Sequence, residues 1–368
     1  MTESLIKQDG IELLLSDDAV ADVARLIPQG KTLVVSSRSF SQRGELSKLQ
    51  NAIGPERSVL HDSVTGNPDI SDLDRLFKQL RKENIKNIVA LGGGSVIDVA
   101  KVLSVLLSQN IENSLDLFEP HFRLTSERCF VIAIPTTAGT GAEVTPFATV
   151  WNTRAKKKLS LTNCRANIAL LDPRYIETLP EQHLIYPGLD ALSHAVESLW
   201  NKNRTVKSTE LANKAIDGIV RSLPRLIKNR KDKEAQKELL VAASYAGLAI
   251  CETKTALAHA LSYSLTLNYG VPHGLACSVT LRGIVDTFGL DKLNLSRVEA
   301  DKVRKLLELL QPEVELETYV SWDRARDELL SGLDPSRAAN FCITAAPHQI
   351  DRIIACSASY AGDEYVGS

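Results

Sequence analysis

Asp190 and His194 stand four residues apart in a stretch with helical apolar spacing, so a helix would place this carboxylate and imidazole on one face. His259 follows, and His273 lies fourteen residues beyond it, after a Tyr-Gly-Val-Pro segment that should end one helix before the next begins. One carboxylate and three neutral imidazoles suit Fe²⁺ or Zn²⁺ better than Mg²⁺ or Ca²⁺, which prefer oxygen ligands. The spacing alone also allows a hydrogen bond within one helix for the first pair and an ordinary Pro-His-Gly turn for His273.

Two runs of small residues, Gly92–Ser95 and Thr136–Glu143, follow apolar segments and could bind phosphate. The first run lies where a strand over 87–91 gives way to a helix, and the free N–H groups at a helix start favour a pyrophosphate. The second run follows a strand over 130–134, and open α/β sheets bind ligands at the carboxyl ends of their strands. The spacing matches neither G-x-G-x-x-G nor the P-loop motif. The absence of the P-loop (Walker) lysine argues against ATP hydrolysis. A glycine-rich turn without a ligand is the alternative for each run.

The elements that must position these residues change in kind along the chain. Short apolar runs in the first half alternate with helix-like stretches such as 70–83 and 96–107, which predicts a doubly wound, mainly parallel sheet. Segments 147–151 and 159–162 flank a polar turn and predict an appended hairpin. The predicted strands of the main sheet lie over 32–36, 58–61, 87–91 and 130–134.

The strand pattern nearly disappears after residue 179. Helical spacing recurs over 181–200, 205–228, 232–251, 256–267 and 298–310. We therefore expect an α/β dinucleotide-binding domain over residues 1–179 and an all-helical domain over residues 180–368 that carries the metal ligands and the substrate site.

Composition and charge exclude several classes of protein. A net charge of −2 and 5% aromatic residues argue against a nucleic-acid or membrane-surface binder. No apolar run reaches the roughly 18 residues of a membrane span, and the first ten residues lack the layout of a signal peptide. The six cysteines form no C-x-x-C pair, which is typical of reduced thiols. We expect a cytoplasmic protein with no nucleic-acid or membrane partner.

In combination and in this order, the motifs resemble the signature segments of the iron-containing (group III) alcohol dehydrogenase family. The segments are Gly92-Gly93-Gly94-Ser95-x-x-Asp98, Pro135-Thr136-Thr137-Ala138-Gly139-Thr140-Gly141-x-Glu143, Gly188-Leu189-Asp190-Ala191-Leu192-Ser193-His194-Ala195-x-Glu197, and His259-Ala260-Leu261 with Pro272-His273-Gly274. The resemblance extends from about residue 10 to residue 350. It implies a metal-dependent, NAD(P)(H)-linked alcohol dehydrogenase or aldehyde reductase, with cofactor and metal in a cleft between the two domains.

The resemblance also assigns roles to individual residues. Asp190, His194, His259 and His273 would hold one divalent metal, Fe²⁺ or Zn²⁺, and would act in catalysis through it. The cofactor would be bound by Ser37, Arg38, Gly92, Gly93, Gly94, Ser95, Asp98, Thr136, Thr137, Thr140 and Lys158.

Two departures from the family pattern bear on the cofactor and on proton transfer. Relatives often have Asp after the strand over 32–36, where this chain has Ser37 and Arg38. Without that carboxylate a 2′-phosphate is not repelled and Arg38 could pair with it, so the sequence favours NADP(H). Many relatives also have a histidine four residues after the position of His259, where this chain has Tyr263. The Tyr263 hydroxyl is the available substitute in a proton relay.

Within the family, segments 144–151 and 253–263 look most like the phosphonoacetaldehyde reductase (hydroxyethylphosphonate dehydrogenase) branch. Lys254, five residues before His259 and expected on the same helix, could bring a cation to a dianionic phosphonate, although a solvated lysine is the alternative. We therefore expect a small, anionic aldehyde or alcohol as substrate, with reduction of phosphonoacetaldehyde to 2-hydroxyethylphosphonate by a homodimer as the best candidate.

Three other functions stay open at this stage. One is a dehydrogenase of a simple primary alcohol, a polyol or a sugar acid. Another is a lyase of the dehydroquinate-synthase type, which needs more lysine and arginine near the metal ligands than this sequence shows. The third is a catalytically silent nucleotide-binding homologue, against which the complete set of four metal ligands argues.

Overall fold

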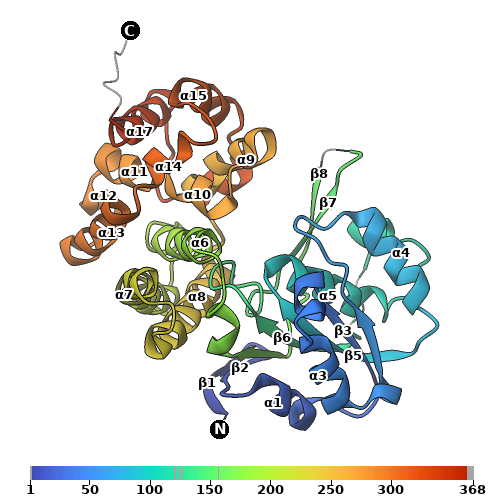
Figure 1. Ribbon diagram of the computed structural model, residues 1–368. Helices are drawn as coiled ribbons and strands as arrows, with labels where there is room; N and C mark the ends of the chain where they lie inside the picture. Colours follow the sequence, from blue (N-terminus) through green and yellow to red (C-terminus); the bar gives the residue numbers. More distant parts are fainter. Residues whose placement is uncertain (1, 120–121, 124, 126, 156, 363–368) are drawn as a thin grey trace. The chain divides into compact units, whose positions relative to one another are not determined.

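The computed structural model describes residues 2–119, 122–123, 125, 127–155 and 157–362. The chain divides into two compact units, one formed by residues 1–137 and 142–176 and the other by residues 138–141 and 177–368 (Figure 1). Among the described residues, no helix combines the length and the apolar character needed to cross a membrane.

The first unit is built on a seven-stranded sheet with the strand order β1-β2-β9-β6-β5-β3-β4. The pairing of β1 with β2 is antiparallel, and every other pairing in this sheet is parallel. The strands are β1 (Glu3–Gln8), β2 (Ile11–Leu15), β3 (Lys31–Ser36), β4 (Ser58–His61), β5 (Ile85–Gly92), β6 (Phe130–Pro135) and β9 (Ile168–Leu171). Because β3, β5 and β6 run parallel to one another, their carboxyl ends lie side by side: Ser36 pairs with Leu91, and Gly92 pairs with Pro135.

Helices cover both faces of this sheet. The helices of the first unit are α1 (Ala19–Leu26), α2 (Arg38–Gln42), α3 (Glu45–Ile53), α4 (Ile70–Leu80) and α5 (Gly94–Leu106). Leu33 and Val35 of β3 pack into one core with α4 and α5, whereas Val34 packs into a second core with α1 and α3. Successive residues of one strand therefore face different helical layers, which confirms the predicted doubly wound, mainly parallel sheet.

A separate antiparallel hairpin, β7 (Ala148–Asn152) and β8 (Lys157–Leu161), follows β6. The predicted hairpin is present, but its second strand begins earlier than expected: Lys157 and Lys158 pair with Asn152 and Trp151. A basic run on an exposed hairpin can join the strand because its side chains extend into solvent.

The second unit is helical, as expected, and its described residues contain one isolated bridge, between Asn201 and Phe341. The long helices closely follow the predicted ranges; they are α6 (Gln182–Leu199), α7 (Val206–Lys228), α8 (Lys233–Thr253), α9 (Leu257–Tyr269) and α13 (Arg297–Leu310). The remaining helices are α10 (His273–Ser278), α11 (Leu281–Phe288), α12 (Leu290–Leu293), α14 (Pro312–Leu316), α15 (Trp322–Ser331), α16 (Pro335–Ala338) and α17 (Pro347–Ser359).

Candidate active site

Three helices of the second unit bring one carboxylate and three imidazoles together. Asp190 and His194 lie one turn apart on α6, His259 lies on α9, and His273 is the first residue of α10. The Oδ1 atom of Asp190 is 3.6 Å from Nε2 of His194, 3.4 Å from Nε2 of His259 and 3.9 Å from Nε2 of His273. The structure thus gathers the four residues that the sequence named as metal ligands around one carboxylate oxygen.

These separations match the space that a metal ion needs. With bonds of about 2.0–2.2 Å to nitrogen and oxygen, the ligand atoms of a tetrahedral site lie about 3.3–3.6 Å apart. Asp190 Oδ1 and His259 Nε2 are buried without a hydrogen-bond partner, although buried polar atoms normally have one. The cluster therefore fits a divalent ion, and its oxygen and nitrogen donors suit Fe²⁺ or Zn²⁺.

The turn into α10 brings His273 close to α6. The preceding helix α9 ends at Gly270, which adopts the left-handed conformation, and Pro272 then occupies the N-cap position of α10. A Cβ atom on Gly274 would lie 1.9 Å from the carbonyl oxygen of Tyr186 and 2.9 Å from Cβ of Asp190. Only glycine permits this close approach of the two helices beside the carboxylate.

Glu197, one turn beyond His194 on α6, fixes the orientation of His259. Its side chain is fully buried, and its Oε2 atom is 2.7 Å from Nδ1 of His259. It also accepts backbone N–H bonds from Ala256, Ala258 and His259, at 2.8, 2.6 and 3.2 Å, where α9 begins. An ionised carboxylate can only accept, so Nδ1 of His259 is the donor of this hydrogen bond and Nε2, which faces Asp190, is the atom left to bind a metal ion.

Burial and mutual charge set the protonation of the cluster. Burial acts to raise the pKa of Asp190, but the surrounding imidazoles outweigh it and hold that pKa below its usual range. Burial lowers the pKa of His194 to about 4, so this ring is neutral at pH 7. A carboxylate and a neutral imidazole are the protonation states that bind metal ions.

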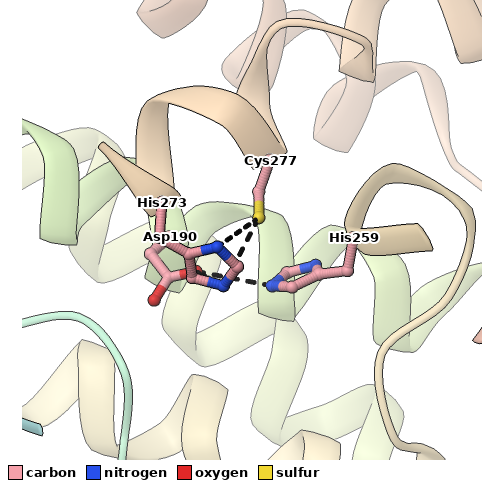
Figure 2. Close-up of side chains that lie close together, drawn as sticks. All are labelled: Asp190, His259, His273 and Cys277. Atoms are coloured by element: carbon pink, nitrogen blue, oxygen red, sulfur yellow. Dashed lines mark hydrogen bonds and ion pairs between the residues drawn. The ribbon is translucent and has the colours of Figure 1, made fainter. Parts of the chain in front are cut away.

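Cys277, which was not among the predicted ligands, lies in one group of donor atoms with Asp190, His259 and His273 (Figure 2). Its sulfur is fully buried and lies 3.7 Å from each ring nitrogen of His273, one turn earlier on α10. Burial opposes ionisation of this thiol, but the imidazoles of His259 and His273 lower its pKa to about 7. The sequence signal was the pair His273-x-x-x-Cys277, which has the same helical spacing as Asp190-x-x-x-His194.

Tyr263 contacts one of the proposed ligands, whereas Lys254 lies at the end of another helix. The Tyr263 ring stacks on His273 with a centroid separation of 5.9 Å, and burial raises its pKa to about 12, so the phenol keeps its proton at pH 7. We had expected Lys254 to lie on the same helix as His259, and the structure shows that it does not. It is the exposed C-cap of α8, with a left-handed φ of 61°, and this conformation ends α8 before α9 starts.

The Gly92–Ser95 run forms the turn from β5 into α5 in the first unit. Gly93 is the N-cap of α5 and provides no side-chain cap for the first N–H groups. A Cβ atom on Gly93 would lie 3.3 Å from Oγ1 of Thr137, and the Thr136 N–H donates to the carbonyl of Gly92 at 3.1 Å. The structure therefore places Gly92, Gly93, Gly94, Ser95, Thr136 and Thr137 side by side at the carboxyl edge of β5 and β6, where a helix start fits a pyrophosphate.

The rest of the second run belongs to the other unit. Residues 138–141, including Thr140, group with the helices. A Cβ atom on Gly139 would lie 2.5 Å from Cβ of Pro187, and one on Gly141 would lie 2.5 Å from Cα of Gly247. Close packing on α6 and α8 therefore explains these two glycines without a ligand.

The other candidate cofactor residues lie in the first unit. Ser37 is the N-cap of α2 directly after β3, and Arg38 is exposed beside it. Near this position lies Asp62, whose pKa is lowered by a hydrogen bond from Ser41 and also by the charge of Arg38. A carboxylate therefore does accompany Arg38, although it follows β4 rather than β3.

Asp98 and Lys158 lie within electrostatic range of each other. Asp98 accepts the N–H of Thr149 at 3.0 Å and lies 3.5 Å from the buried ammonium of Lys101. Burial raises the pKa of Asp98 despite these cations. The exposed Lys158 on β8 lies over the Trp151 ring, 5.8 Å from its centroid.

The sequence and the fold both match known proteins. Residues 12–173 match the family described as iron-containing alcohol dehydrogenase, and residues 184–314 match its C-terminal family. The chain is 36% identical to phosphonoacetaldehyde reductase of Streptomyces viridochromogenes, over 66% of this chain and 63% of that protein. It is 32% identical to 4-hydroxybutyrate dehydrogenase of Clostridium kluyveri, over 85% of this chain and 83% of that protein.

A solved structure of an iron-containing alcohol dehydrogenase from Thermotoga maritima superposes with a TM-score of 0.75 at 29% identity, over 92% of this chain and 94% of that one. Both units of the chain are thus matched by models of one family, and the donor atoms gathered in the second unit fit a metal ion. The chain belongs to the iron-containing alcohol dehydrogenase family and is an oxidoreductase of that family.

Proposed function

We propose that the protein reduces a small aldehyde with an anionic group, using NAD(P)H, and that phosphonoacetaldehyde is the best candidate substrate. The observation that supports the proposal is the pair of buried atoms Asp190 Oδ1 and His259 Nε2, which lie 3.4 Å apart without a hydrogen-bond partner and which a metal ion would satisfy. A bound nicotinamide cofactor would supply the hydride for the aldehyde carbon, and the aldehyde oxygen would take a proton. The products are 2-hydroxyethylphosphonate and NAD(P)⁺.

The residues around the cluster set the protonation states that metal binding and proton transfer require. A divalent ion bound there would supply Lewis-acid chemistry, which offsets the negative charge that develops on the substrate oxygen. The Glu197 carboxylate accepts a hydrogen bond from Nδ1 of His259 and so keeps the ring proton on that nitrogen, and burial keeps His194 neutral. Tyr263 holds a phenolic proton beside His273 and is our candidate for a proton donor to the substrate oxygen.

The turn between β5 and α5 is our candidate pyrophosphate site. The first N–H groups of α5 and the Ser95 hydroxyl would bind phosphate oxygens, with Thr136 and Thr137 beside them. We further propose that Asp98, Thr140 and Lys158 take part in holding the cofactor.

The preference between NADP(H) and NAD(H) depends on the residues after β3. We propose NADP(H), because the exposed Arg38 can pair with a 2′-phosphate. Asp62 weakens this preference, since its carboxylate already interacts with Arg38. Initial rates with NADPH and NADH at equal concentration test the assignment, and a higher kcat/KM with NADH would contradict it.

Two relatives support an anionic substrate. Phosphonoacetaldehyde reductase and 4-hydroxybutyrate dehydrogenase are both named for small substrates that carry a phosphonate or a carboxylate. We propose that Lys254, exposed in the connection between α8 and α9, attracts this anionic group.

A panel of aldehydes tests the function. Phosphonoacetaldehyde, 4-oxobutyrate and propanal should be compared with the Fe²⁺- and Zn²⁺-loaded protein. We expect the highest kcat/KM with phosphonoacetaldehyde. Preference for propanal would indicate a simple-alcohol enzyme, and no net NAD(P)H consumption by metal-loaded protein would indicate a lyase or a silent homologue.

The variant Lys254→Ala tests substrate recognition. Loss of one ionic contact worth about 1.4 kcal/mol would raise KM for phosphonoacetaldehyde roughly tenfold and leave KM for propanal unchanged. Lys228→Ala, which removes an exposed lysine from the last turn of α7, is the matched control. Equal effects of Lys254→Ala on both aldehydes would refute its role.

We also propose a homodimer, which light scattering should show as twice the mass of the chain.

A further inference from the structure

Cys277 differs from other cysteines of the chain in what its sulfur contacts. Cys129, Cys164 and Cys251 each have a backbone carbonyl as partner, those of Ile85, Pro146 and Gly247 respectively. The sulfur of Cys277 instead contacts side chains: it lies 3.3 Å from Oγ of Ser262 and 3.7 Å from each ring nitrogen of His273. A thiol surrounded by imidazoles is in an environment that favours metal binding over simple packing.

The position of the sulfur fits coordination to the same ion as the carboxylate. One donor atom from each of Asp190, His259, His273 and Cys277 lies within 4.8 Å of the other three. With a metal–sulfur bond of about 2.3 Å and a metal–nitrogen bond of about 2.05 Å, the angles of about 90–120° in a five-coordinate site separate sulfur from nitrogen by about 3.1–3.8 Å. The observed 3.7 Å to Nε2 of His273 lies within this range.

A second, independent observation places a ligand at this point. Asp190 Oδ1 and His259 Nε2 are buried, lack hydrogen-bond partners and belong to the same group as the sulfur. Figure 2 shows the Asp190, His259 and His273 side chains directed toward one another with the Cys277 sulfur beside them. An ion that satisfies the two unpartnered atoms would therefore also have the thiol within reach.

We propose that Cys277 Sγ is a further ligand of the divalent ion, in addition to the carboxylate and the imidazoles. The inference rests on the proposed function for the presence of that ion. Coordination replaces the S–H bond by a sulfur–metal bond, and the proton passes to solvent. Because thiolate is a soft donor, this fifth group shifts the selectivity of the centre toward Zn²⁺ compared with a centre of oxygen and nitrogen donors alone.

Spectroscopy of the cobalt-substituted protein tests the proposal without an activity measurement. Metal-free protein should be loaded with Co²⁺, and the near-ultraviolet absorption should be recorded for wild type, Cys277→Ser and Cys251→Ser. A thiolate ligand gives a sulfur-to-cobalt charge-transfer band that oxygen and nitrogen ligands do not give. We expect the band in wild type and in Cys251→Ser, and its loss in Cys277→Ser, with one Co²⁺ still bound to each.

X-ray absorption of the zinc-loaded wild type provides a test that needs no variant, so it decides the question even if Cys277→Ser does not fold. A sulfur at about 2.3 Å from zinc would support the proposal. One bound zinc with only oxygen and nitrogen neighbours would overturn it and leave the proposed function intact. Folded wild-type protein that binds neither Co²⁺ nor Zn²⁺ would overturn both.

Discussion

Replacing Glu197 with Gln should weaken metal binding, although Glu197 itself is not one of the proposed ligands. With the Gln oxygen at the Oε1 position, the N–H groups of Ala258 and His259 keep their acceptor. The amide nitrogen then faces Nδ1 of His259 and the N–H of Ala256, where Oε2 now accepts at 2.7 and 2.8 Å. Nδ1 must become an acceptor, so the ring proton moves to Nε2, the atom that faces Asp190.

The opposite orientation of the amide preserves the tautomer but opposes two backbone N–H donors instead of one. Each unsatisfied buried donor costs about 1–3 kcal/mol, so the orientation that changes the tautomer is the less costly one. Loss of a carboxylate behind a metal-binding histidine typically reduces affinity about 10–100-fold, or about 1.4–2.7 kcal/mol. We expect the Zn²⁺ dissociation constant of Glu197→Gln to rise by this factor.

Titration of the metal-free protein with Zn²⁺ against a chromophoric chelator measures the dissociation constant, and thermal unfolding of the metal-free form reports damage to the fold. Glu252→Gln is a suitable control, because Glu252 lies near the end of α8 and pairs with Lys207 at 3.2 Å. A Zn²⁺ affinity of Glu197→Gln within twofold of wild type would refute the tautomer argument.

Two further changes probe the site and its support. His259→Ala removes a proposed ligand, so stoichiometric metal and aldehyde reduction should both be lost while the far-ultraviolet spectrum is kept; retained metal and activity would exclude His259 as a ligand. Glu313→Ala leaves the buried Arg282 without the partner that accepts its bonds at 2.8 and 2.5 Å, and breaking such a pair costs about 3–5 kcal/mol. The loss should appear in urea unfolding of the helical unit, with a smaller effect for Glu313→Gln. An unchanged urea midpoint would show that stacking of Arg282 on Tyr360 is sufficient.

The fold was predictable wherever the pattern was long or repeated. The apolar runs that became β3, β5 and β6 are buried on both faces of the sheet, so their composition alone identified them as strands. Strands β1, β2 and β9 were not predicted, because β1 is a largely exposed edge strand and β2 and β9 are mainly apolar runs of only five and four residues, which periodicity does not identify. Helices α12 and α16 are four residues long, which is too short for apolar periodicity to show.

The site was predictable only in part. A helix fixes the separation of Asp190 and His194, so their spacing indicated a possible shared cation, although it also allowed a hydrogen bond within the helix. Nothing in the spacing of His259 or His273 relates them to α6, because that relation depends on the packing of α9 and α10; the family resemblance supplied it. Lys254 was misplaced for a similar reason: a left-handed residue that ends a helix is not visible in a pattern without glycine.

The residues that assemble the centre stand between and beside its ligands in the same short motifs. On α6, Glu197 continues the helical face of Asp190 and His194, and it both starts α9 and orients His259. On α10, Gly274 follows His273 directly and permits the approach to the Tyr186 carbonyl that brings this imidazole to Asp190. Each of the two motifs therefore carries at least one proposed ligand together with a residue that positions a ligand relative to the other helices. Residues 194 and 259 are separated along the chain by α7 and α8, so these local contacts, rather than closeness in sequence, bring the donors together.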